Sequence, residues 1–355
     1  MNIKIGNRTI GENQPAFIVA ELSCNHRQNF DLAVKTIKAM KESGADAIKL
    51  STDSPSGLTL DSDNEYFQIK QGTVWDGTTL YKLYQETDTP WEWQPKLKKI
   101  AEDLGMICFS TPCDAKAADF LEKELNVPAY KIASFEITDY DFIKYVAKKG
   151  KPIIISTGIA FEDEIKDVID LCRKAGNNQI IILKCTSSYP TDPKEMNLLT
   201  IPDIKKKYKV EVGLSDHSLS TVVPAIAVTL GAKVIEKHFI LDRNLGGPDA
   251  LFSLEPIEFK EMVGNIREVE KALGKVTYDL SARSKKNRQF SRSLFVTKDI
   301  KEGESLTNKN IRSIRPGFGL HPKFITQVIG SKAKKDLMQG TPLEQNYFSK
   351  ETDAI

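Results

Sequence analysis

Apolar and β-branched residues gather in short runs along this chain, and longer amphipathic segments separate the runs. The apolar runs cover residues 16–23, 46–52, 106–111, 129–134, 152–157, 180–186, 210–216 and 233–239. Apolar residues at helical spacing recur over 29–43, 93–104, 114–125, 139–149, 161–175, 219–230 and 256–273. Continuous apolar strands that alternate with helices predict a parallel sheet covered by helices.

Eight such strands before residue 275 predict a (β/α)8 fold, the TIM barrel, within the α/β class. The alternative is a doubly wound open sheet. That fold commonly carries a glycine-rich dinucleotide loop after its first strand, and we find none here. The pattern therefore favours a barrel over residues 1–275.

Two segments depart from a plain barrel. Residues 53–92 are long and rich in aromatic side chains, which is typical of a lid or a substrate-binding loop. Residues 276–292 are basic and poor in large aliphatic side chains, which indicates a linker. Short pieces with turn signals fill 293–355 and predict a small β-rich domain.

Composition narrows the class of protein. The chain has 355 residues, of which 40% are hydrophobic and 28% are charged, as is typical of a globular protein. Its net charge of +2 does not indicate binding to nucleic acid or to a membrane surface. No apolar run reaches membrane-spanning length, and the first residues lack the apolar core of a signal peptide. Five cysteines without metal-site spacing indicate reduced thiols, so we expect a cytoplasmic protein.

Two of the four histidines, His217 and His238, lie at the ends of the last two predicted strands. Adjacent strands lie about 5 Å apart, so both imidazoles can converge on one ion. Such a pair suits Mn, Zn or Fe, with a carboxylate, water or substrate in the remaining positions. The alternative is a pair of hydrogen-bonded histidines at the barrel mouth.

Lysines and hydroxyl side chains also gather at the strand ends, where a barrel places its active site. Lys49 and Lys131 are expensive to bury unless they face a charge. With the hydroxyls of Thr111, Ser134, Ser156 and Ser215 they would cradle a phosphate or carboxylate. The alternative is that each lysine extends its ammonium group to water at a strand end.

Glu21 and Glu136 are the candidate proton-transfer groups, because each is a carboxylate at a strand end near this predicted site. The alternative role for each is a structural ion pair with one of the lysines. These residues together predict a metal-assisted barrel enzyme that acts on a small anionic substrate.

The ordered motifs "AELSCNH", "STPCD", "YKIASFE", "IISTG", "CTSSYPT", "GLSDHS", "EKHF" and "GPD" resemble the sialic acid synthase family. The stretch "RSLFVTKDIKEGESLTNKNIRSIRPGFGLHP" is similar to that family's antifreeze-like (SAF) domain. The resemblance runs nearly end to end, and it implies a metal-dependent transferase. Such an enzyme condenses phosphoenolpyruvate with the open-chain aldehyde of an acetamido sugar, and releases phosphate by C–O cleavage.

The resemblance also implies roles for individual residues. His217 and His238 would bind a divalent metal, most often Mn²⁺, and Glu21 would be a catalytic glutamate. The implied phosphoenolpyruvate contacts are Lys49, Thr111, Lys131, Ser134, Ser156 and Ser215. The implied contacts on the sugar side are Glu136, Tyr189 and Asp249, with Ser187 a further substrate contact where many members have asparagine. Arg315 would reach a neighbouring subunit's barrel in a domain-swapped homodimer.

Two fragments, "TVWDGTTLYKLYQETDTPWEW" and "KIASFEITD", are more similar to the family's pseudaminic acid branch. The sugar of that branch is 2,4-diacetamido-2,4,6-trideoxy-L-altrose, and an aromatic lid could bury its methyl groups. The legionaminic and N-acetylneuraminic acid branches are the alternatives. A metal-dependent barrel aldolase or hydrolase, and a non-catalytic binding protein, are more distant ones.

Overall fold

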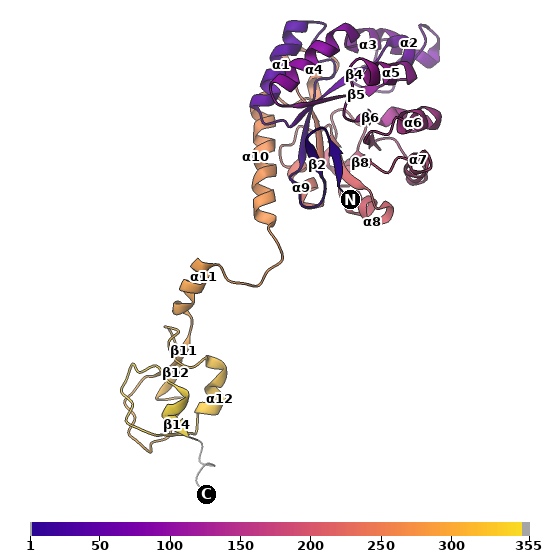
Figure 1. The fold of residues 1–355 in the computed structure, drawn as a ribbon. Helices are drawn as coiled ribbons and strands as arrows, with labels where there is room; N and C mark the ends of the chain where they lie inside the picture. Colours follow the sequence, from indigo (N-terminus) through magenta and orange to yellow (C-terminus); the bar gives the residue numbers. More distant parts are fainter. Residues whose placement is uncertain (1, 350–355) are drawn as a thin grey trace. The chain divides into compact units, whose positions relative to one another are not determined.

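The computed structural model describes residues 2–349, and these divide into two units. The first unit ends at Gly274 and the second begins at Lys275. Figure 1 shows the helices of the first unit around the outside of its strands. No helix among residues 2–349 is both long and apolar enough to cross a membrane.

Eight parallel strands close the first unit into a barrel in the order β10-β3-β4-β5-β6-β7-β8-β9. The strands are β3 Phe17–Glu21, β4 Ala47–Thr52, β5 Ile107–Pro112, β6 Tyr130–Ile132, β7 Ile153–Ser156, β8 Ile180–Cys185, β9 Glu211–Asp216 and β10 Val234–His238. Each lies within one of the eight predicted runs or overlaps it closely. The TIM-barrel prediction is therefore confirmed, and the open doubly wound sheet is excluded.

A helix follows each barrel strand, at once or after an inserted segment. These helices are α1 Phe30–Glu42, α4 Gln94–Asp103, α5 Ala115–Lys123, α6 Tyr140–Ala147, α7 Glu162–Lys174, α8 Thr200–Tyr208, α9 Val223–Thr229 and α10 Pro256–Leu273. Side-chain caps fix several of their starts; for example, Asp114 accepts the backbone N–H of Ala117 at the start of α5. Helix α8 was not among the segments that helical spacing predicted.

A short hairpin precedes the barrel and was not predicted. Its strands, β1 Ile3–Ile5 and β2 Arg8–Ile10, pair antiparallel, and their isoleucines are buried in the barrel core. The turn at Gly6 lies against Ile107, the first residue of β5, and against Pro128, just before β6. The hairpin therefore closes the amino-terminal end of the barrel, opposite the strand ends that carry polar side chains.

The segment 53–92 is partly helical rather than a plain loop. It holds α2 Pro55–Leu58 and α3 Leu80–Thr87, and Thr79 caps α3 by accepting the N–H of Lys82. The Trp75 indole N–H donates to the carbonyl of Pro248 at 3.0 Å, so the segment is fastened to the loop after β10. The segment thus covers the barrel mouth as an ordered structure.

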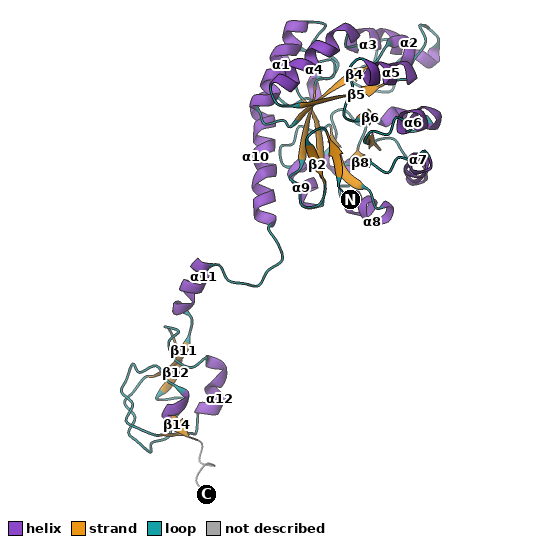
Figure 2. Cartoon of the chain, in the orientation of Figure 1, coloured by secondary structure: helices purple, strands orange, loops and turns teal. Residues whose placement is uncertain are grey.

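The second unit consists mainly of loops with short strands (Figure 2). Its elements are α11 Ala282–Asn287, β11 Ser293–Val296, β12 Ile311–Ile314, α12 Ile325–Val328, β13 Lys332–Ala333 and β14 Phe348–Ser349. A separate apolar core, which includes Leu294, Leu306 and Leu343, holds it together. Helix α11 occupies part of the segment that the sequence indicated as a linker.

Candidate active site

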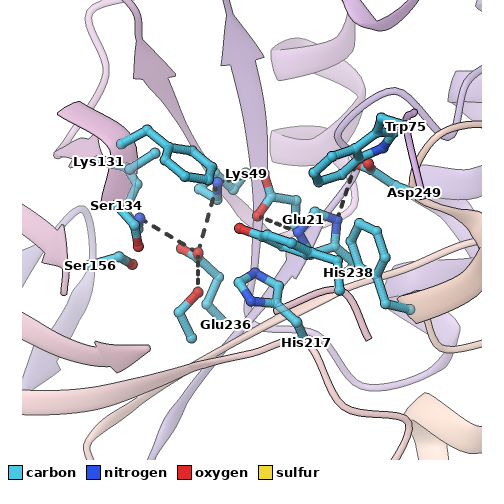
Figure 3. A pocket seen from close by; sticks show the side chains of 15 residues that line it. Glu21, Lys49, Trp75, Lys131, Ser134, Ser156, His217, Glu236, His238 and Asp249 are labelled. Carbon is cyan, nitrogen blue, oxygen red and sulfur yellow. Dashed lines mark hydrogen bonds and ion pairs between the residues drawn. The ribbon is translucent and has the colours of Figure 1, made fainter. Parts of the chain in front are cut away.

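A cavity of about 170 Å³ opens at the carboxyl ends of the barrel strands, and we call it the strand-end cavity (Figure 3). Its lining residues are Glu21, Lys49, Trp75, Lys131, Ala133, Ser134, Phe135, Ser156, Tyr189, Ser215, His217, Glu236, His238, Asp249 and Phe252. Most of the residues that the sequence predicted for a catalytic site therefore meet in one place. Strand alternation explains this, because successive lumen-facing side chains at each strand end point into the same space.

The two predicted lysines face each other across Glu236. Lys49 Nζ lies 3.8 Å and Lys131 Nζ lies 3.6 Å from Glu236 Oε1, which also accepts a hydrogen bond from Ser215 Oγ at 3.0 Å. Burial lowers the pKa of Lys131 despite the nearby Glu236 carboxylate. Both ammonium groups are buried and turned into the cavity, so neither lysine extends to bulk water as the alternative required.

Glu21 forms an ion pair with Lys49, with 2.5 Å between Oε1 and Nζ. Its other oxygen, Oε2, lies 3.5 Å from His238 Nε2. Burial raises the pKa of Glu21, but the Lys49 ammonium and His238 outweigh burial and hold that pKa below its ordinary value. Glu21 is therefore a carboxylate at neutral pH, able to accept a proton. The ion pair that we considered as its alternative role is also present.

Hydroxyl groups line the side of the cavity next to the lysines. Thr111 Oγ1 accepts a hydrogen bond from Lys49 at 3.2 Å, and Ser134 Oγ accepts the backbone N–H of Gly158 at 3.0 Å. Within the described residues, the buried Ser156 Oγ, Ser187 Oγ and Glu236 Oε2 have no hydrogen-bond partner. Buried polar atoms are seldom left unpaired, so these atoms indicate a place for a polar ligand.

The two predicted histidines lie together at the other side of the cavity, with ring centroids 5.4 Å apart. His217 Nδ1 lies 3.1 Å from the carbonyl oxygen of Thr186. His238 Nδ1 makes no hydrogen bond within the described residues and lies 3.5 Å from Asp249 Oδ2. Burial lowers the pKa of His217, but the Cys185 thiol outweighs this and raises it overall.

These histidines fit a shared metal ion. Two imidazole nitrogens that each lie about 2.0–2.1 Å from one ion hold their ring centroids about 4.5–6.5 Å apart. The observed separation falls in this range, and within residues 2–349 the Nδ1 of His238 makes no hydrogen bond. Across residues 2–349, no group of three or more His, Cys, Asp or Glu side chains is arranged to hold a metal. The ion's further ligands would therefore come from water or substrate.

A second cavity, of about 520 Å³, adjoins the first, and we call it the aromatic cavity. Its lining residues are Ser23, Asp53, Tyr66, Gln68, Ile69, Gln71, Thr73, Trp75, Leu80, Leu83, Tyr84, Thr87, Phe135 and Asp249. The two cavities share Trp75, Phe135 and Asp249. The segment 53–92 supplies most of this lining, and its role as a substrate-binding loop stays a prediction.

Two further acidic residues, Asp53 and Glu136, have raised pKa values. Asp53 lines the aromatic cavity, and burial together with repulsion from Glu136 raises its pKa to about 8. Burial also raises the pKa of Glu136, which follows Ser134 in a short 3-10 helix after β6. Three of the site residues predicted in the first unit, Glu136, Thr111 and Ser187, line neither of the two cavities in the described structure.

Tyr189 and Asp249, expected on the sugar side, both line the strand-end cavity. The Tyr189 ring packs between Trp75, at 5.1 Å between centroids, and His217, at 4.5 Å. Arg315 belongs to the second unit, where it is exposed after β12. Its predicted contact with a barrel remains a prediction.

Sequence reasoning did not assign Glu236, Asp53, Trp75 and Phe252 to the site. Glu236 had a detectable signal, because it alternates with His238 along the same strand. Trp75 and Phe252 lie in connecting segments, where no periodicity tells which side chain turns inward. Asp53 directly follows β4 and is an acidic residue at a strand end like the others.

Comparison with known proteins gives the class of this protein. Residues 36–278 match the model of the NeuB family, and residues 291–347 match the SAF domain. The chain belongs to the NeuB family.

Curated relatives that carry the name pseudaminic acid synthase come from two species. The Campylobacter jejuni protein is 47% identical over 346 residues, covering 98% of this chain and 100% of its own. The Helicobacter pylori protein is 48% identical over 331 residues, covering 93% of this chain and 97% of its own.

Among solved structures, the N-acetylneuraminic acid synthetase of Leptospira borgpetersenii, in complex with citrate, matches with a TM-score of 0.72 and 30% identity. It covers 81% of this chain and 95% of its own. The family resemblance seen in the motifs is therefore confirmed.

Proposed function

We propose that this protein is a pseudaminic acid synthase. It condenses phosphoenolpyruvate with 2,4-diacetamido-2,4,6-trideoxy-L-altrose to a nine-carbon α-keto acid and releases phosphate, as a metal-dependent transferase. Two relatives of that name, each identical at nearly half of the aligned positions over almost the whole chain, support the proposal. The observation that carries it is a small cavity that holds two buried lysines and is joined to a larger aromatic one.

The strand-end cavity suits phosphoenolpyruvate. Lys49 and Lys131 supply positive charge for its phosphate and carboxylate, and Ser134, Ser156 and Thr111 supply hydroxyl donors. The substrate would compete with Glu236 for both ammonium groups and would satisfy the unpartnered Ser156 hydroxyl. These groups bind the anion and hold its reactive carbon toward the histidines.

The aromatic cavity suits the sugar. Trp75, Leu80, Leu83 and Tyr84 present apolar surface to the C6 methyl and the acetamido methyl groups. Asp249 and Trp75 belong to both cavities, so a sugar bound there can extend its aldehyde carbon into the strand-end cavity. The remaining hydroxyl and amide groups find Gln68, Gln71 and Thr73 along the same wall.

The reaction balances without an external oxidant or reductant. Carbon 3 of phosphoenolpyruvate forms a bond to the aldehyde carbon, and the aldehyde oxygen takes up a proton. Water adds to carbon 2 and gives up a proton, for which the Glu21 carboxylate is the acceptor in reach of His238. The resulting tetrahedral carbon releases phosphate by cleavage of its C–O bond and becomes the ketone.

By family resemblance, His217 and His238 would hold a divalent ion, manganese. When bound, the metal supplies Lewis acidity toward the aldehyde oxygen. The separation of the two rings and the unpaired Nδ1 of His238 support this assignment. The Asp249 carboxylate lies 3.5 Å from this nitrogen, and its negative charge would favour a cation there.

The proposal extends to assembly and location. By resemblance the protein is a cytoplasmic homodimer in which Arg315 of one subunit reaches the sugar in the partner's barrel. A mixing experiment tests this: Arg315→Ala and Glu21→Gln subunits, each inactive alone, should form one working site when they exchange. Exchange without any recovery of activity would rule out the swap.

The reaction class is tested with phosphoenolpyruvate labelled with ¹⁸O in its bridging oxygen. With the diacetamido sugar present, mass spectrometry should find the label in the released phosphate and the nine-carbon acid as product. Label retained in the organic product would contradict C–O cleavage. Turnover of the sugar without phosphoenolpyruvate would instead indicate an aldolase or hydrolase.

A further inference from the structure

A buried ion pair lies on the outer face of the two strands that carry the predicted metal-binding histidines. Asp216 and Lys237 are direct partners in the β9–β10 register, and 2.7 Å separates Asp216 Oδ2 from Lys237 Nζ. Both side chains have 0% exposure. Because side chains alternate along a strand, this pair points toward the surrounding helices while its neighbours point into the cavity.

The pair also fixes the turn that follows β9. Asp216 Oδ1 accepts the backbone N–H of Ser218 at 2.8 Å, and Lys237 donates a second hydrogen bond to the Ser218 carbonyl. Lys237 therefore holds both ends of the three-residue stretch 216–218 against strand β10. Each of these bonds is short and shielded from water.

The residues between and beside these anchors are the two histidines. His217 lies between Asp216 and Ser218, and His238 follows Lys237 directly. The ion pair between Asp216 and Lys237 therefore links the backbone segments that carry the two imidazoles. The ring centroids of these imidazoles lie 5.4 Å apart. Neither Asp216 nor Lys237 lines the strand-end cavity.

Stability alone does not explain a charged pair at this position. The cost of removing two charges from water offsets much of their attraction, and apolar replacements of similar volume are often neutral or stabilising. The preceding outward-facing position on β10 holds an apolar residue, the buried Ile235. A better-attested use of a buried polar pair is to fix one arrangement of the chain.

We propose that Asp216 and Lys237 are positioning residues that set the separation and orientation of His217 and His238. They act through the backbone and touch neither substrate nor metal. This inference goes beyond the proposed function, because it concerns how the two strands are held. The Mn²⁺-binding measurement described below rests on the proposed metal role of the histidines, whereas the crystal structure of the variant does not.

The principal variant is Asp216→Asn together with Lys237→Met. Asparagine keeps an oxygen for the Ser218 N–H, and methionine fills most of the lysine volume, so no unpaired charge remains buried. Lys237→Met alone would leave Asp216 charged and unpaired, and that variant is at risk of not folding. The double variant removes the side-chain ion pair between β9 and β10 and retains the hydrogen bond from the Ser218 N–H to residue 216.

Binding of Mn²⁺ to the purified full chain is measured by calorimetry. We expect the double variant to bind 10–100-fold more weakly, as is typical when groups that orient metal ligands are lost. Phosphoenolpyruvate affinity, measured without metal, should be unchanged because Lys49 and Lys131 are untouched. The matched control is Asn177→Leu, at the opposite end of the barrel, which removes hydrogen bonds to the carbonyls of Ala147 and Lys151 and one from the backbone N–H of Gln179. It should bind Mn²⁺ as the wild type does.

A crystal structure of the double variant gives the second readout. We expect imidazoles of His217 and His238 that are displaced or in several conformers, in an otherwise intact barrel. Wild-type Mn²⁺ affinity with wild-type ring placement would overturn the proposal and leave the pair a packing feature. If the wild type itself binds no Mn²⁺, the metal part of the proposed function fails, and the ring placement alone decides on the positioning role.

Discussion

The strand-end cavity and the aromatic cavity share three residues but are built from different parts of the chain. Strand ends of the barrel supply the first, so its charged groups sit on a rigid frame fastened by many interstrand hydrogen bonds. An inserted segment, 53–92, supplies most of the second. Under the proposed function, the barrel frame would carry the chemistry and the inserted segment would select the sugar, as loops on a barrel commonly do.

Of the substitutions that we propose, removing one of the two predicted metal-binding histidines should lower turnover the most. His217→Ala or His238→Ala should lower kcat by at least about 10²-fold, because a Lewis acid supplies several kcal/mol to such a reaction. Phosphate release and circular dichroism are the measurements, and the fold should persist. His321→Ala, in the second unit, is the control and should be near wild type. Full activity of the wild type in excess chelator would contradict the metal assignment.

Removing the predicted proton acceptor, the Glu21 carboxylate, should lower kcat by a similar factor. Glu21→Gln keeps the size of the side chain and should lower kcat by about 10²–10⁴-fold. Affinity for phosphoenolpyruvate should hold within a few-fold, because Lys49 and Lys131 keep their charges. Calorimetry and turnover separate the two effects. Lost binding with unaltered kcat would show that Glu21 serves the anion site and not the proton transfer.

The aromatic cavity should respond differently. Leu80→Ala removes apolar surface from its wall and should lower kcat/KM for the diacetamido sugar about 10-fold. The KM for phosphoenolpyruvate should not change, because Leu80 does not line the strand-end cavity. Val74→Ala, an exposed position in the same segment, is the matched control. A rise in the phosphoenolpyruvate KM instead would show that the cavities do not divide the work as stated.

The smallest effect concerns stability. The pKa of Asp53 is raised to about 8 in the folded chain from an ordinary value of 3.8, so the folded state holds this proton longer than the unfolded state. Its contribution to stability is present below about pH 4 and is lost as the pH rises to about 8.

Asp53→Asn should therefore unfold less readily than the wild type at pH 8.5, by on the order of 1–3 kcal/mol after allowing for partial exposure. At pH 4 the two should be similar. Denaturant unfolding at both pH values is the measurement, with the exposed Asp61→Asn as control. An equal difference at both pH values would refute the titration of Asp53 as its cause.

The two cavities also differ in how well the sequence predicts them. Strand runs such as 152–157 show both the strand and the polar residue at its end, and alternation then sets which side chains face the lumen. Lys49, Ser156 and His238 could be placed this way. Glu236 was available by the same rule but was not assigned.

Strand alternation does not predict the lining of the aromatic cavity, because this lining depends on how an irregular segment folds. Aromatic content marked residues 53–92 as a substrate loop, yet nothing periodic showed that Trp75 lines a cavity while Leu60 is largely exposed. Helix α3 had a readable signal in Thr79 and the spacing of Leu80, Leu83 and Tyr84. The three-residue strands β1 and β2 are too short for any pattern.

The central claim is that the aromatic cavity selects a doubly acetylated, 6-deoxy sugar for chemistry performed at the strand ends. The most direct test is the ratio of kcat/KM for 2,4-diacetamido-2,4,6-trideoxy-L-altrose to kcat/KM for N-acetylmannosamine, measured by phosphate release at saturating phosphoenolpyruvate. Two additional apolar contacts at about 1–3 kcal/mol each predict a ratio of at least about 10². A ratio near one would contradict the claim and would assign the chain to a synthase of broader sugar range.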